Sequence, residues 1–225
     1  MLLPILSAAQ APAAAQAVDV AIVLAVDASA SVDAGEFRLQ MEGTADALEN
    51  PDVLAAIARG NRGAIAVSTM QWSTLDQQAV TLGWTVIRDA SDAAAAASVI
   101  RNAPRMVIPS GTALGDAVSF AMGMLGRLPY SADRLVVDVS GDGKNVHPPL
   151  LLRVKERAVW AGITINGLPI ISADPNIHYY YQDTVIAGPG AFIEIADSYE
   201  VFGEAMRRKL IREIKGPPPV SMLAD

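Results

Sequence analysis

The chain has 225 residues, of which 52% are hydrophobic, and it carries a formal net charge of −7 with no cysteine. Its size and apolar content suit one globular domain with a sizeable core, while its acidic balance argues against nucleic acid and anionic lipid as partners. The absence of cysteine excludes disulfides, thiolate metal sites and cysteine nucleophiles.

Residues 1–17 are rich in alanine and apolar side chains, and they end in an Ala-Gln-Ala triplet that fits the cleavage site of an export signal. Because the basic opening of such a signal is missing, a disordered Ala/Pro tail is the alternative. The apolar stretch is too short for a convincing membrane span, so we expect no stable membrane insertion. We expect a leader at residues 1–17, a folded domain at residues 18–215 and a Pro-rich tail at residues 216–225.

Residues 20–26 form an almost unbroken apolar run, which is typical of a strand buried on both faces of a parallel sheet. The run ends at Asp27, and Ser29 and Ser31 complete a D-x-S-x-S pattern. Open α/β sheets bind ligands at this carboxyl edge, and oxygen ligands suit Mg²⁺, Mn²⁺ or Ca²⁺. The alternative is a turn in which Asp27 accepts hydrogen bonds from nearby backbone N–H groups.

Helices and strands alternate along the rest of the chain. Hydrophobic periodicity predicts helices at residues 35–50 with a continuation at 51–58, 91–101, 112–128, 148–161 and 198–214. It predicts further strands at residues 63–72, 77–86, 133–140, 162–168 and 191–195, and a long loop at residues 174–190. Strand 77–86 is expected to pair antiparallel with strand 63–72. The fold class is therefore α/β, with a doubly wound, mostly parallel sheet, one antiparallel edge strand and helices on both faces.

Two later segments carry oxygen-bearing side chains where the same sheet edge is expected. Thr112 follows Ser-Gly at the entrance to a helix, where capping is its alternative role. Asp142 lies in a Gly-Asp-Gly turn after a buried strand, where an ordinary turn aspartate is the alternative. Together with the first motif, the set provides two carboxylates and three hydroxyls, and water can complete the shell of an ion. Such an ion stays electron-poor and can attract a carboxylate from a partner.

These segments resemble the metal-ion-dependent adhesion site (MIDAS) of von Willebrand factor type A (vWA) domains. The matching residues, in the order of that family, are Asp27, Ser29, Ser31, Thr112 and Asp142. Gly141 stands where the third segment commonly carries Thr, and we expect this difference to affect the ion little. The resemblance covers residues 18–214. It implies a vWA fold, a divalent cation with Mg²⁺ favoured over Mn²⁺ or Ca²⁺, and a protein partner whose Asp or Glu binds that cation.

More narrowly, the chain resembles a bacterial family of exported proteins that consist of one such domain. The supporting stretches are AVDASASVDAGEF, SGDGKN and VIAGPGAFIEIADSYEVFGEAMRRKLIREI. This resemblance implies a periplasmic or secreted adhesion or scaffolding module, and it implies no particular partner.

A haloacid-dehalogenase-like phosphohydrolase is the enzymatic alternative, because such enzymes also begin with Asp after the first strand and carry a Gly-Asp-Gly turn near an Asn, here Asn145. That chemistry needs a second carboxylate two residues after the nucleophile, and position 29 is Ser. His147 and His178 lack a supporting triad pattern, so we do not expect an enzyme. A structural domain with a vestigial metal site is a further alternative.

Other polar and aromatic residues have structural interpretations. We expect Asp33 to cap the helix that follows it and Trp72 to pack in the core. Asp138 interrupts an apolar strand and must find a donor if it points inward. The three tyrosines at residues 179–181 suit either a partner contact or ordinary loop packing.

Overall fold

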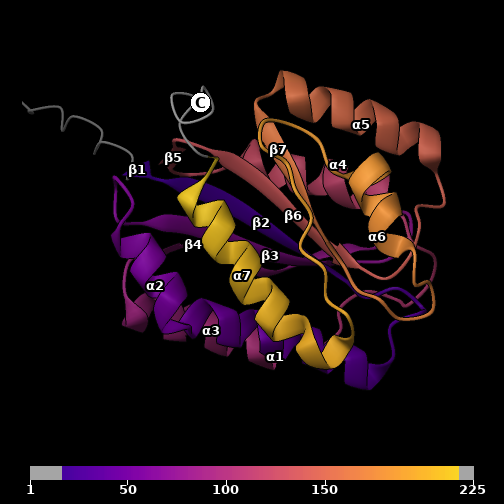
Figure 1. Cartoon of the computed structure of the whole chain (residues 1–225), viewed down its shortest axis with the longest axis horizontal. Coiled ribbons are helices and arrows are strands. Elements are labelled where there is room, and N and C mark those ends of the chain that lie inside the picture. The colour runs from indigo at the N-terminus through magenta and orange to yellow at the C-terminus, as the bar shows by residue number, and fades with distance from the viewer. Residues whose placement is uncertain (1–16, 218–225) are drawn as a thin grey trace, which may run out of the picture.

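A five-stranded sheet crosses the middle of the protein, with helices packed against both of its faces (Figure 1). The structure is a computed structural model and describes residues 17–217. The strand order is β4-β3-β2-β6-β7. These strands are β2 (Val20–Asp27), β3 (Ile65–Trp72), β4 (Gln78–Ile87), β6 (Leu135–Gly141) and β7 (Ile163–Pro169). Neighbours pair in parallel except β3 and β4, which confirms the predicted sheet with one antiparallel edge strand.

A second, two-stranded sheet joins the beginning of the described chain to its middle. In it, β1 (Ala17–Val18) pairs in parallel with β5 (Ser131–Ala132). Residues 1–16 and 218–225 lie outside the described residues, so the leader and most of the Pro-rich tail stay predictions. Among residues 17–217, none of the helices has the length and hydrophobicity that crossing a membrane requires.

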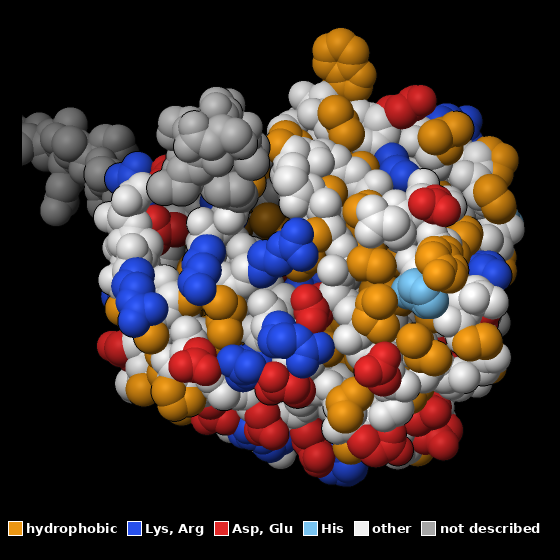
Figure 2. Space-filling view, in the orientation of Figure 1, with side chains coloured by type: hydrophobic (Ala, Val, Ile, Leu, Met, Phe, Trp, Pro, Cys, Tyr) orange, Lys and Arg blue, Asp and Glu red, His pale blue; other side chains and the backbone are white. Residues whose placement is uncertain are grey.

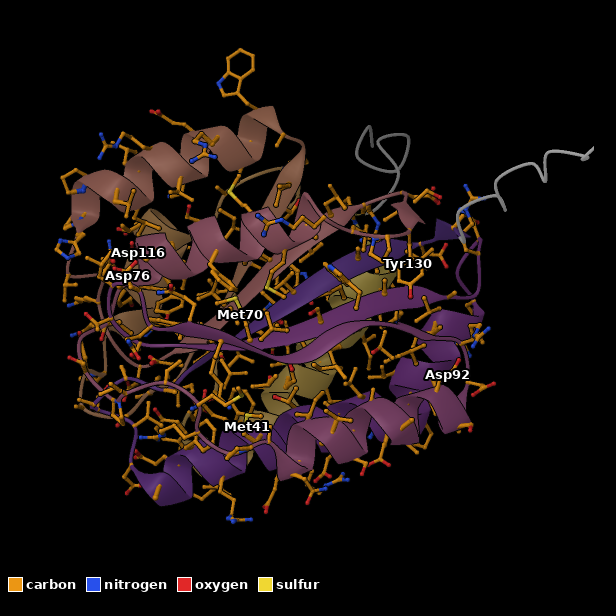
Figure 3. All side chains as sticks on the ribbon, turned by 180° about the vertical axis from the view of Figure 1, so that it is seen from behind. Met41, Met70, Asp76, Asp92, Asp116 and Tyr130 are labelled. Atoms are coloured by element: carbon orange, nitrogen blue, oxygen red, sulfur yellow. The ribbon has the colours of Figure 1, made fainter. Side chains whose placement is uncertain are left out.

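The helices form one layer on each face of the sheet (Figure 1). One layer contains α1 (Ala34–Glu49), α2 (Pro51–Ala58), α3 (Ala90–Asn102) and α7 (Phe202–Lys215). The other contains α4 (Leu114–Leu125) and α5 (Pro148–Trp160). The side chains of β2 alternate between the two resulting cores, and all eight residues of this strand are buried. Figure 3 shows the two cores from behind, with Met41 on the α1 side and Met70 on the α4 side.

Charge is unevenly distributed over this fold. Figure 2 shows basic side chains gathered over α7, although the chain as a whole is acidic. Arg212 and Lys215 lie in the last turn of α7, where positive charge interacts favourably with the helix dipole.

Local signals set the beginning of several helices. Asp33 accepts a hydrogen bond from the Glu36 N–H at 2.8 Å, while Glu36 accepts one from the Asp33 N–H at 2.7 Å. This capping box confirms the predicted cap of α1. Asn50 ends α1 and caps α2, whose first residue is Pro51. The helix predicted from residue 112 begins only at Leu114, because Ala113, with φ −99° and ψ 66°, is its non-helical N-cap.

The segment after β7 differs most from the prediction. In place of a continuous loop, it contains the helical turn α6 (Ile177–Tyr180) and the π-helical turn η1 (Tyr181–Val185). The tyrosine triplet divides within this segment. Tyr179 is exposed, Tyr180 is half-buried and Tyr181 is fully buried.

The predicted edge strand at residues 191–195 is wrong. This stretch forms one isolated bridge, between Gly167 and Ile193, and Ala196 directly after it bridges Ile170. A side chain replaces part of the expected ladder, because Asn166 Oδ1 accepts a hydrogen bond from the Phe192 N–H at 3.0 Å. The chain then enters α7 through the 3-10 turn η2 (Tyr199–Val201).

Asp138 points from β6 into the core beneath α7. Its Oδ1 lies 2.7 Å from Lys209 Nζ, which also lies 2.6 Å from Glu213 Oε1. Lys209 therefore supplies the positive charge that compensates the buried Asp138, in place of the expected hydrogen-bond donor. Because burial disfavours the charged form and Glu213 adds a second negative charge, the pKa of Asp138 rises from 3.8 to about 7.

We expect this cluster to make stability fall as the pH rises from 3.8 towards 7. In that range the folded protein keeps a proton on Asp138 that the unfolded chain releases, so raising the pH favours unfolding by up to about 1.4 kcal/mol per pH unit. The unfolding free energy, measured by urea unfolding in EDTA at several pH values, should therefore fall less steeply with pH for Asp138→Asn than for wild type. Asp27 titrates in the same range in both proteins, so equal slopes would contradict the prediction for Asp138.

Candidate metal centre

Asp27, Ser29 and Ser31 lie where β2 ends, at the carboxyl edge of the sheet. Asp27 Oδ1 accepts a hydrogen bond from the Ser29 N–H at 2.8 Å, and the hydroxyls of Ser29 and Ser31 are 3.1 Å apart. Asp27 and Ser29 are buried, whereas Ser31 is exposed. The motif thus forms a line of oxygens that leads from the core to the surface.

The backbone holds this line in place through the residues between the motif positions. The Ala28 N–H donates to the Trp72 carbonyl at 2.8 Å, and the Ala30 N–H donates to the Ser110 carbonyl at 2.7 Å. Trp72 itself is buried, as predicted, and its indole N–H donates to the Ala25 carbonyl at 3.1 Å. The loops after β2 and β3 and the segment before α4 are therefore joined at one edge.

Asp142 connects the third predicted segment to the first. Ser31 Oγ donates to Asp142 Oδ1 at 2.7 Å. This contact follows from the sheet, because β6 is the direct neighbour of β2 and the residues after the two strands meet. Asp142 is only 6% exposed. An ordinary turn aspartate would not account for its bond to a hydroxyl in another loop.

Thr112 lies beside the same turn. A Cβ atom at Gly143 would lie 2.7 Å from Thr112 Oγ1, so the glycine leaves the room that this hydroxyl occupies. The Thr112 carbonyl accepts a hydrogen bond from the Val146 N–H at 3.0 Å. The capping interpretation is wrong, because Ala113 is the N-cap of α4 and no side chain caps that helix.

The three predicted segments thus meet at one end of the sheet. Figure 3 shows this end on the left, where Asp116 of α4 and Asp76 of the loop after β3 are labelled. Tyr130 and Asp92 mark the opposite end in the same view.

The surroundings of Asp27 disfavour the charged form of its carboxyl group. It is completely buried, and its Oδ2 accepts no hydrogen bond from any residue in the described range. Burial raises its pKa from 3.8 to about 7, hydrogen bonds from Ser29 oppose this rise, and the charge of Asp142 adds to it. A buried carboxylate oxygen without a partner costs free energy unless a positive charge or a donor compensates it.

These residues fit a divalent cation. Carboxylate and hydroxyl oxygens are hard ligands, and a cation would compensate the buried Asp27. Within residues 17–217, no three or more His, Cys, Asp or Glu side chains cluster in a way that could hold a metal. Hydroxyl groups would therefore supply much of the shell, as the sequence analysis expects.

Two buried residues that support this edge were not predicted from the sequence. Gln40 of α1 donates through Nε2 to the Asp27 carbonyl at 3.0 Å, and Ser140 Oγ lies 3.4 Å from Gln40 Oε1. A polar residue between Phe37 and Met41 on the buried face of the helix was the available signal. Tyr181 is the second residue, and only its place in a tyrosine triplet drew attention to it.

The family model described as "Protein of unknown function (DUF1194)" matches residues 17–218. Among curated protein sequences, none matches this chain.

Several solved structures share the fold. A von Willebrand factor type A protein from Catenulispora acidiphila has a TM-score of 0.62 at 17% identity, covering 88% of this chain and 43% of its own. The pilus adhesin SpaC from Lactobacillus rhamnosus GG has a TM-score of 0.62 at 16% identity, with coverages of 88% and 31%. Proximal thread matrix protein 1 from the mussel byssus, with a zinc-occupied MIDAS motif, has a TM-score of 0.56 at 16% identity, with coverages of 88% and 47%.

This chain spans less than half the length of each of these three proteins. At such low identities the likeness shows the fold alone. It confirms the vWA fold that the motifs predicted.

Proposed function

Because the chain belongs to the DUF1194 family and has a vWA fold, we propose that it is a metal-dependent protein-binding module. In this proposal, a divalent cation at the carboxyl edge of the sheet binds an Asp or Glu side chain of a partner. The chain performs this role after export, in the periplasm or outside the cell. The Ala-Gln-Ala triplet and the resemblance to exported bacterial proteins support the location.

One observation carries the proposal, namely the convergence of oxygen-bearing side chains from three distant segments around a buried carboxylate. The residues that would hold the cation are Asp27, Ser29, Ser31, Thr112 and Asp142. The cation would supply a positive, electron-poor centre for a carboxylate. The chain itself contributes the buried charge of Asp27, the bond from Ser31 to Asp142, and an opening to the surface at Ser31.

We propose Mg²⁺ as the resident ion, because its preferred ligands are oxygens and it retains bound waters that a partner can replace. Mn²⁺ and Ca²⁺ also take oxygen ligands. The zinc-occupied MIDAS motif of the mussel protein supports a divalent ion at the corresponding place in this fold.

Exposed apolar side chains beside the site support a protein as the partner. Leu75, Ile108 and Val146 are 54%, 68% and 50% exposed, and they lie on three loops next to Thr112. The loops are in contact, since Ser73 Oγ donates to the Ile108 carbonyl at 2.8 Å and a Cβ atom at Gly111 would lie 3.9 Å from Val146. Exposed apolar surface with a polar rim is typical of interaction sites.

We expect Thr112→Val to weaken partner binding about tenfold or more, equivalent to about 1.4 kcal/mol. The substitution keeps the shape of the side chain and removes one oxygen from the site. The measurement is capture of partners from the envelope fraction of the host, in parallel with Mg²⁺ and with EDTA, followed by titration of the captured protein.

Thr164→Val is the matched control, because Thr164 lies near the start of β7, away from the carboxyl edge, and its hydroxyl bonds the Pro189 carbonyl. The control should bind like wild type. Capture that is equally strong in EDTA would refute the proposed mechanism.

An assay of phosphate-ester hydrolysis with Mg²⁺ distinguishes the phosphohydrolase alternative from the binding module. Ser29 occupies the position at which that chemistry needs an acid, and its hydroxyl contacts Ser31. Turnover that disappears in Asp27→Asn would favour an enzyme over a binding module.

A further inference from the structure

Two buried oxygens beneath the candidate site lack hydrogen-bond partners among the described residues, and they flank the same space. They are Asp27 Oδ2 and the hydroxyl of Tyr181. A Cβ atom at Gly141 would lie 2.6 Å from the first and 2.9 Å from the second. Gly141 therefore keeps open the space between a carboxylate oxygen and a hydroxyl that can donate to it.

A second glycine makes room for the ring of Tyr181. A Cβ atom at Gly167 of β7 would lie 2.7 Å from Tyr181 Cδ1. Gly141 ends β6, and β6 pairs with β7 on one side and with β2 on the other. The tyrosine thus lies across β7 and the end of β6, with its hydroxyl close to the carboxylate that ends β2.

The segment that carries Tyr181 is firmly attached. Ile177 and Val185, on either side of the tyrosine, are fully buried in the same core as Tyr181. The hydroxyl of the preceding Tyr180 accepts a hydrogen bond from the Asn145 N–H at 3.2 Å, which ties the segment to the loop of Asp142. Tyr181 also opens the π-helical turn η1, a geometry that is frequent at functional sites.

We propose that Tyr181 is a positioning residue of the cation site, donating its hydroxyl hydrogen to Asp27 Oδ2 through one water in the space beside Gly141. This inference rests on the proposed function for the cation, but the Tyr181–Asp27 contact does not need the ion. The contact compensates part of the buried charge and directs Asp27 Oδ1 toward Ser29. It also explains Gly141, since a threonine there would collide with both oxygens. The sequence suggested that glycine in place of threonine at this position would affect the ion little. In this proposal, Gly141 instead provides the space between Asp27 and Tyr181.

The first experiment measures Mg²⁺ affinity by calorimetric titration. We expect Tyr181→Phe, which keeps the ring and removes the hydroxyl, to weaken binding about tenfold or more, as is typical when the hydrogen-bond partner of a metal ligand is lost. Tyr179→Phe is the matched control, because that side chain belongs to the same triplet and is 62% exposed. It should bind Mg²⁺ like wild type.

The second experiment needs no ion. Unfolding free energies in EDTA are measured for wild type, Tyr181→Phe, Asp27→Asn and the double variant. A water-mediated contact makes the two single effects non-additive, because the residues share one interaction. A purely structural tyrosine would give additive effects.

These measurements separate the two proposals. If the wild-type protein does not bind Mg²⁺, the cation site and the positioning role of Tyr181 are both refuted, whatever the unfolding free energies of the four proteins show. When wild type does bind Mg²⁺, either an unchanged affinity in Tyr181→Phe or an additive cycle overturns the role of Tyr181 and leaves the proposed function standing.

Discussion

Replacing Asp27 with asparagine should abolish the stabilisation of the protein by Mg²⁺ and, in EDTA at neutral pH, make it more stable than wild type. The second effect arises because burial disfavours the charged form of this carboxylate and the nearby charge of Asp142 adds to that cost. Asparagine has nearly the same shape and no charge, so it avoids a cost on the order of a few kcal/mol.

With Mg²⁺ the order should reverse. A ligand that binds only the folded state adds about 2.7 kcal/mol when its concentration is a hundred times its dissociation constant. Wild type should gain this stability, and Asp27→Asn should not. Urea unfolding of both proteins, with EDTA and with Mg²⁺, measures the two effects.

Asp76→Asn is the matched control, since Asp76 is an exposed carboxylate at the same end of the sheet (Figure 3). Its backbone is left-handed, with a φ of 56°, and asparagine tolerates that conformation. The control should respond to Mg²⁺ like wild type. An Asp27→Asn variant that keeps the Mg²⁺ effect, or that is less stable than wild type in EDTA, would contradict the interpretation of the site.

Replacing Gly43 with alanine should lower the free energy of unfolding by about 2 kcal/mol, within the range typical of overpacking. Gly43 of α1 faces Gly203 of α7, and a Cβ atom at Gly43 would lie 2.8 Å from Gly203 Cα and 2.9 Å from Gly203 N. These are backbone atoms, so no side chain can rotate away. The gain of about 1 kcal/mol that alanine usually brings to a helix does not offset this collision.

Gly123→Ala should have the opposite effect on the free energy of unfolding. Gly123 lies within α4 and is exposed, and among the described residues no atom outside its own stretch of helix lies within 4 Å of the place where a Cβ would stand. The substitution should stabilise the protein by up to about 1 kcal/mol. Chemical unfolding measures both variants. A Gly43→Ala protein as stable as wild type would show that α1 and α7 can separate at little cost.

The sheet, and the place of the five candidate residues at its carboxyl edge, could be predicted because the signals are local. The apolar run of β2 shows a strand buried on both faces, and the polar residues that follow must lie at its carboxyl edge. Asp142 follows β6 in the same way. The contact between Ser31 and Asp142 required only that the two strands be neighbours, which the structure shows.

The supporting residues could not be predicted because their roles depend on distant parts of the chain. Tyr181 is buried only because Gly141 and Gly167, on two different strands, leave space for it. The apolar alternation of residues 191–195 suggests a strand, yet the side chain of Asn166 takes one of the hydrogen bonds that a ladder would need. The hydrophobic periodicity of one segment gives no information about the space or the hydrogen bonds that residues on distant strands provide.

The close approach of α1 and α7 also limits how these two helices can move against each other. Where two helices touch through glycines, no rotamer change can absorb a small slide, and a shift of one residue would bring Cβ atoms into the space between the backbones. We therefore expect α1 and α7 to move as one unit, including the end of α1 that follows Ser31 by three residues.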